Sequence, residues 1–131
     1  MPQQFTEDQT LSIIPVFKIK QGSTMADCRP FLDECARLVM ENEPDCYQYA
    51  VVIDKNDDRR FALRELYKNG DALLYHMSVV GETLQKLAEH SDVVDMNIYG
   101  KKEELEKLMP TLGRFQPKLW ELQSGGVSSL P

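Results

Sequence analysis

Hydrophobic and polar positions along the chain predict four main strands and two long helices. Alternating apolar residues rich in Ile, Val, Phe and Tyr predict strands at residues 10–20, 46–54, 60–68 and 92–99. Apolar stripes at helical spacing predict helices over residues 25–42 and 71–90, the second of which could break near Val79–Gly81. A short amphipathic helix at 101–109, ended by Pro110, and a last extended segment at 115–122 follow. Pro15 indicates that the first strand lies at a sheet edge or carries a bulge.

The order of these elements is β-α-β-β-α-β, followed by a short helix and an extra strand. This order predicts an α+β fold of the ferredoxin-like kind. The length of 131 residues indicates one domain, which we place at residues 10–123. A polar N-terminal tail at 1–9 and a flexible, turn-rich C-terminal tail at 124–131 are expected on either side of it.

Several predicted strands are apolar on both faces, as the neighbours Ile13 and Ile14, Val16 and Phe17, and Val51 and Val52 show. Two helices can cover only one face of an antiparallel sheet. The other face would then be a large exposed apolar patch unless something covers it. We therefore expect a homodimer in which two copies pack sheet against sheet and close a barrel.

Charge and composition exclude several classes of partner. The net charge is −6 and the pI is about 4.9, which disfavours nucleic acid and anionic membrane surfaces. The apolar runs are too short to span a bilayer, and the N-terminal segment has no basic and apolar leader. The odd set of cysteines, Cys28, Cys35 and Cys46, is typical of free thiols in a reducing compartment. We expect a cytoplasmic protein.

Two residues are the strongest candidates for chemistry. Glu65 shares a strand face with Phe61, Leu63 and Tyr67, so its pKa should be raised unless it is paired, which would suit a general base. His76 lies beside the apolar stripe of the second helix and could carry a proton. Each also has a structural interpretation: Glu65 as an acid tied to His76 or a backbone amide, and His76 as a boundary residue satisfied by Glu65 or a carbonyl.

Four further residues are candidates for lining a substrate pocket. They are Tyr49, Phe61, Tyr67 and Asn97. Tyrosines are more often packing residues, and Asn97 could equally be a polar strand-edge residue. The two histidines, 14 residues apart, and the scattered cysteines lack the spacing of a metal site, and no glycine-rich phosphate loop is present. We therefore expect no metal and no cofactor.

Four short motifs, in this order, resemble the antibiotic biosynthesis monooxygenase family. They are Glu43-Pro44-Asp45-Cys46-x-x-Tyr49, Phe61-Ala62-Leu63-x-Glu65-x-Tyr67, Asp71-Ala72-Leu73-x-x-His76, and Leu119-Trp120-Glu121-Leu122 leading to Gly125-Gly126. The chain departs from the family at Asp45, where a glycine is usual. The resemblance covers roughly residues 10–127.

The resemblance implies a homodimeric α+β barrel with a pocket between sheet and helices in each subunit. Members include cofactor-independent oxygenases of quinols and polyketide-like aromatics, haem degraders and an isomerase of a sugar phosphate. The haem degraders carry an Asn on the first strand and a Trp on the third, which this chain lacks. We therefore expect a cofactor-independent monooxygenase of a small aromatic or quinol-like molecule, with His76 and Glu65 handling protons.

Two alternatives remain open at this point. One is a non-catalytic dimer that binds a small ligand or is associated with stress. The other is an isomerase of a small carbonyl compound, which would need a phosphate-binding group such as Arg64 facing the pocket. An enclosed cavity with His76 and Glu65 pointing into it would favour an enzyme.

Overall fold

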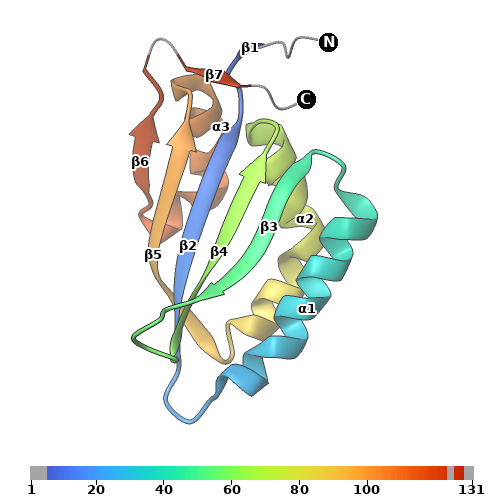
Figure 1. The fold of residues 1–131 in the computed structure, drawn as a ribbon, viewed down its shortest axis with the longest axis vertical. Coiled ribbons are helices and arrows are strands. Elements are labelled where there is room, and N and C mark those ends of the chain that lie inside the picture. Colours follow the sequence, from blue (N-terminus) through green and yellow to red (C-terminus); the bar gives the residue numbers. More distant parts are fainter. Residues whose placement is uncertain (1–5, 124–125, 129–131) are drawn as a thin grey trace.

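The computed structural model describes residues 6–123 and 126–128 and shows a five-stranded sheet with helices packed on one side (Figure 1). The elements of the first half are β2 (Leu11–Ile19), α1 (Met25–Asn42), β3 (Cys46–Ile53) and β4 (Arg60–Tyr67). Those of the second half are α2 (Gly70–Leu87), β5 (Ser91–Gly100), α3 (Lys102–Leu112), the 3-10 helix η1 (Gly113–Phe115) and β6 (Lys118–Glu121).

The strand order in the sheet is β3-β4-β2-β5-β6. β3, β4, β2 and β5 pair antiparallel, and β6 adds to the edge parallel to β5. The predicted α+β, ferredoxin-like fold with a C-terminal helix and an extra strand is confirmed. The strands and the two long helices lie close to their predicted positions because period-two and helical apolar patterns are strong local signals.

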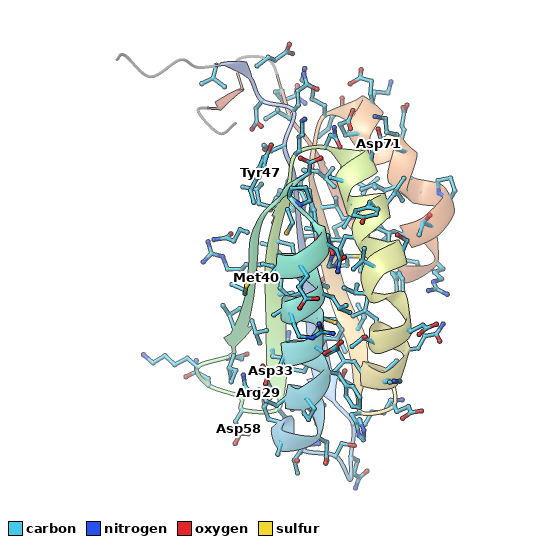
Figure 2. All side chains as sticks on the ribbon, turned by 90° about the vertical axis from the view of Figure 1, so that its right-hand side faces the viewer. Arg29, Asp33, Met40, Tyr47, Asp58 and Asp71 are labelled. Atoms are coloured by element: carbon cyan, nitrogen blue, oxygen red, sulfur yellow. The ribbon has the colours of Figure 1, made fainter. Side chains whose placement is uncertain are left out.

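Strict alternation along β2 separates the two faces of the sheet. Leu11, Ile13, Phe17 and Ile19 are buried under the helices, whereas the residues between them are half-buried on the other face. The turned view shows the strands on one side and the helices on the other (Figure 2). The hydrophobic core therefore lies between sheet and helices, and no described element covers the second face, called here the open face.

Pro15 does not lie at a sheet edge, because β2 is the central strand between β4 and β5. The pairing of β2 with β4 joins Ile13 to Glu65 and Val16 to Ala62 but skips the two positions between, so the missing N–H of Pro15 costs no ladder bond there. The bulge expected near Pro15 is present against β5, where the register shifts between Val16 and Phe17.

The helices differ from the prediction at three places. α2 runs without a break through Gly81, because one glycine costs a helix interior only about 1 kcal/mol. α3 continues through Pro110 to Leu112, because a proline in the last turn removes only one helical hydrogen bond. The segment predicted as a strand from residue 115 begins as a 3-10 helix, and only Lys118–Glu121 is extended.

Two short strands lie within the segments predicted as tails. β1 (Thr6–Glu7) and β7 (Val127–Ser128) pair antiparallel and bring the two ends of the domain together (Figure 1). The remaining tail positions, 1–5 and 129–131, and Gly125 of the last motif lie outside the described residues.

Candidate functional site

A cavity of about 660 Å³ lies between the sheet and the helices α2 and α3. Its walls are largely apolar side chains of β2, β5, α2 and η1, among them Ile13, Phe17, Met77, Met96 and Phe115. The polar residues that line it are Glu65, His76, Gln85, Ser91, Asp92, Thr111 and Arg114. An apolar cavity with a few polar groups is the usual form of a small-molecule site.

Glu65 reaches this cavity because of its position on β4. The alternation of the strand turns Phe61, Leu63, Glu65 and Tyr67 toward the helices, and all four are buried. The Glu65 carboxyl accepts a hydrogen bond of 2.5 Å from the Tyr67 hydroxyl. Burial raises the pKa of Glu65 to about 8, and the Tyr67 hydrogen bond opposes part of this shift. Glu65 can thus exist in both protonation states near neutral pH.

His76 lies opposite Glu65 on α2 and is 2% exposed. The expectation of a position beside the helix stripe is wrong, because His76 falls on the buried face between Leu73 and Val80. Its Nδ1 lies 2.9 Å from Glu43 Oε1 and 3.0 Å from Oε2, and its Nε2 lies 3.5 Å from Glu65 Oε1. Burial lowers the pKa of His76 to about 4, so the neutral ring is favoured.

Glu43 is the residue of this group that sequence reasoning missed. It follows the last residue of α1, where its backbone N–H donates to the Val39 carbonyl and its carboxyl turns inward to His76. Burial raises its pKa to about 7. The sequence signal was the Glu-Pro-Asp motif, which entered the family resemblance without a role being assigned to its glutamate. Glu43 also lines a second hollow of about 480 Å³, with Asp45, Lys68 and Asp71.

Two of the predicted pocket residues, Tyr49 and Tyr67, lie next to His76 and do not line the cavity. The rings of Tyr49 and Tyr67 lie 5.6 and 5.2 Å from the His76 ring, both tilted against it. The pKa of each tyrosine is raised, first by burial and then by the charge of Glu65. The buried Tyr49 hydroxyl has no hydrogen-bond partner among the described residues, and its pKa is also affected by the nearby Cys35 thiol. Both tyrosine rings thus lie close to the imidazole, from neighbouring strands of the sheet.

The other two predicted pocket residues are placed apart. Phe61 stacks on Phe17 with ring centroids 4.9 Å apart, so it supports the wall that Phe17 forms. Asn97 lies on the open face, where its Oδ1 accepts a 2.9 Å hydrogen bond from Trp120 Nε1, and it does not line the cavity. Its neighbours Met96 and Ile98 point to the helices, so alternation turns Asn97 outward.

The cationic residue of the cavity is Arg114, not Arg64. Arg64 is exposed on the open face between the buried Leu63 and Glu65. Arg114 lines the cavity and lies over the Phe115 ring, 4.7 Å from its centroid. Within residues 6–123 and 126–128, no three His, Cys, Asp or Glu side chains are arranged to hold a metal ion. None of the described helices is long and apolar enough to cross a membrane.

Solved structures with the same fold share this architecture. The chain matches MupZ from Pseudomonas fluorescens with a TM-score of 0.72 and 24% identity, over 88% of this chain and 92% of that one. It matches SnoaB, a cofactor-independent oxygenase from Streptomyces nogalater, with a TM-score of 0.62 and 10% identity, over 72% and 94%. A third match, from Caulobacter crescentus, is described as a candidate antibiotic biosynthesis monooxygenase, with a TM-score of 0.60 and 19% identity, over 70% and 86%.

The chain has the fold of the antibiotic biosynthesis monooxygenases. The resemblance drawn from the motifs is thereby confirmed at the level of the fold. Identities of 24% and below do not transfer an activity, because this fold can carry unrelated chemistries.

One curated protein also matches by sequence. Ubiquitin carboxyl-terminal hydrolase 5 of Saccharomyces cerevisiae is 30% identical over 119 residues, which is 79% of this chain but 15% of that protein. The chain thus spans about 15% of the length of this relative. No protein-family model matches the chain.

Proposed function

We propose that this protein belongs to the antibiotic biosynthesis monooxygenase family and oxygenates a small aromatic or quinol-like molecule without a cofactor. The observation that carries the proposal is the pair of Glu65 and His76, both buried and both lining one apolar cavity. An ionisable pair with opposite pKa shifts in a largely apolar cavity is typical of acid–base chemistry.

The apolar walls suit the ring of an aromatic substrate, and Glu65 suits the first chemical step. Its carboxylate, made a stronger base by burial, takes a proton from the phenol or activated C–H of the substrate. The resulting carbanion-like anion is electron-rich and donates electrons to O₂, and a peroxide forms at carbon. Loss of water from that peroxide leaves a carbonyl, so one oxygen atom enters the product and the other leaves as water. Exclusion of water by the cavity protects the anion.

Arg114 supports the same class of substrate. It is the one arginine among the residues that line the cavity, and it lies on η1 across from the sheet. A guanidinium there would attract the oxyanion that forms when a phenol is deprotonated. Arg64, the residue expected to bind the phosphate of an isomerase substrate, faces away from the cavity, so that alternative would depend on Arg114.

The protein acts as a homodimer in this proposal. Val16 of β2, Ala62 of β4 and Val52 of β3 form a row across the open face. This apolar row has no cover in a single copy, and an identical sheet packed against it would remove it from water. We also place the protein in the reducing cytoplasm, since its three cysteines are free thiols.

Oxygen uptake tests the function. The wild-type protein should consume O₂ with at least one member of a panel of quinols and polyphenols, and ¹⁸O₂ should label the product. His76→Ala should lower kcat at least about a hundredfold, because it removes the imidazole beside the base. His90→Ala is the matched control, since this histidine binds Ser23 outside the cavity. Ligand binding without oxygen uptake would instead support the non-catalytic alternative.

A further inference from the structure

The His76 ring joins two carboxyl groups that belong to different hollows. Glu65 lines the large apolar cavity, whereas Glu43 lines the second hollow. Asp71, at the start of α2 (Figure 2), lines the second hollow as well. His76 lies between them with one ring nitrogen directed to each carboxyl. The three side chains come from β4, α2 and the end of α1, so the arrangement depends on the tertiary fold.

The contacts of Nδ1 suit one tautomer of the ring. Both oxygens of Glu43 are within 3.0 Å of Nδ1, and we assign the ring proton to Nδ1, where its N–H donates a hydrogen bond to the carboxylate. Nε2 of a neutral ring is then an acceptor facing Glu65 Oε1 at 3.5 Å. This distance is at the outer limit of a hydrogen bond, and such contacts commonly tighten when a substrate fills the site.

We propose that Glu65, His76 and Glu43 form a relay that carries the proton removed from the substrate out of the cavity, with Glu43 as its outer end. The proposal rests on the monooxygenase function above and adds a role for Glu43. Glu43 would be a positioning and proton-accepting residue that never touches the substrate, because it does not line the substrate cavity.

Each transfer in the relay conserves protons and charge. The Glu65 carboxylate takes a proton from the substrate and becomes a carboxylic acid. Glu65 then gives this proton to His76 Nε2 while Nδ1–H passes its proton to Glu43, so the neutral ring changes tautomer. Glu43 releases the proton to water in the second hollow. The peroxide anion then takes a proton back along the same groups, from Glu43 to Nδ1 and from Nε2 through Glu65. This reverse transfer supplies the proton that leaves in water and returns the ring to its first tautomer.

The surroundings of the three groups fit such transfers. Burial raises the pKa of Glu43 to about 7 and that of Glu65 to about 8, so the two ends hold a proton with similar affinity. Other titratable side chains lie close to these carboxyls, and their pKa values are raised by burial and by the charges of Glu65 and Glu43, so they are neutral: Tyr49, Tyr67, Cys35 and Cys46. Asp45, Lys68 and Asp71 line only the hollow at the Glu43 end.

Kinetics of Glu43→Gln test the relay. The amide still accepts a hydrogen bond from Nδ1–H but cannot take the proton, so kcat should fall about tenfold to a hundredfold while KM stays unchanged. The solvent isotope effect on kcat should rise, and formate should restore activity to Glu43→Ala. Glu104→Gln is the control: this glutamate is also buried, but it binds the Gly70 N–H away from the cavity.

A measurement independent of turnover separates the two proposals. Exchange of the His76 Nδ1 proton with water, followed by ¹⁵N NMR in the full chain, should slow in Glu43→Gln if Glu43 is the exit. Turnover by the wild type with kcat and exchange unchanged in Glu43→Gln would overturn the relay and leave the function intact. Absence of wild-type turnover would overturn the function, and the exchange rate would then decide whether Glu43 still conducts the proton.

Discussion

Alternate residues of the single strand β4 lie in two different environments. Phe61 and Glu65 are buried under the helices. Ala62 and Arg64, which lie between them in the sequence, face the open side of the sheet. Burial makes Glu65 a weaker acid than usual and raises its pKa to about 8. The side chain of Arg64 stays exposed to solvent. The difference shows that the acid–base chemistry of this strand depends on which face the helices cover, because removal from water is what raises the pKa of a carboxyl group.

Truncation of Phe61 should show the largest contrast between the faces. Phe61 is 1% exposed and stacks on Phe17, so Phe61→Ala should lower the free energy of unfolding by about 3–5 kcal/mol. Val52→Ala on the open face should cost less than about 1 kcal/mol in a single copy, since that side chain is 37% exposed there. Urea unfolding at a protein concentration low enough to keep the chain monomeric measures both. Similar losses for the two variants would contradict the comparison.

The same alternation explains how much of the site could be predicted. Glu65 was found because a carboxylate stands out among Phe61, Leu63 and Tyr67 on a strand face. Asn97 was assigned to the pocket although Met96 and Ile98 beside it are the apolar, inward positions, so strand periodicity argued against it. The fold was predictable for the same reason: the strands and long helices each repeat a local pattern over eight or more residues.

The parts that were missed depend on contacts without a local pattern. Glu43 meets His76 across 33 residues of sequence, and the Glu-Pro-Asp motif that contains it does not show that its carboxyl turns inward. The predictions for Pro15 and Pro110 used only the general preferences of proline. Pro15 lies where the pairing of β2 with β4 is already interrupted, and Pro110 lies in the last turn of α3, where it removes only one helical hydrogen bond. The two-residue strands β1 and β7 are too short to show any periodicity.

The pH dependence of stability sharpens the contrast between the faces. Glu65 has a pKa of about 8 in the fold against 4.5 ordinarily, so the unfolded chain loses this proton first and stability falls as pH rises through that range. His76, with its pKa lowered from 6.5 to about 4, has the opposite effect, but only below pH 6.5. Between pH 6.5 and pH 8 the buried carboxyls of Glu65 and Glu43, with their raised pKa values, make stability fall as pH rises.

We therefore expect the free energy of unfolding of the wild type to fall between pH 6.5 and pH 8. In Glu65→Gln this fall should be smaller by about 1–2 kcal/mol, because the amide does not titrate. Urea unfolding at several pH values measures the slope. Asp95→Asn on the open face should keep the wild-type slope, because this carboxylate is partly exposed and lies 3.5 Å from Lys118. A slope that Glu65→Gln leaves unchanged would show that Glu65 is not held neutral by burial.

The smallest effect concerns the open face itself, which should become buried only when two copies meet. Val16 lies at the β2 end of the apolar row, and Val16→Thr keeps its shape and strand preference while adding a hydroxyl. A hydroxyl in the dimer interface should raise the dissociation constant about tenfold, or about 1.4 kcal/mol, whereas it costs little in a free protomer. Analytical ultracentrifugation over a range of concentrations measures this change. Met40→Gln, on an 85% exposed residue of α1, should leave it unaltered. If Val16→Thr dissociates no more readily than the wild type, or the wild type is a monomer, the open face is not where two copies join.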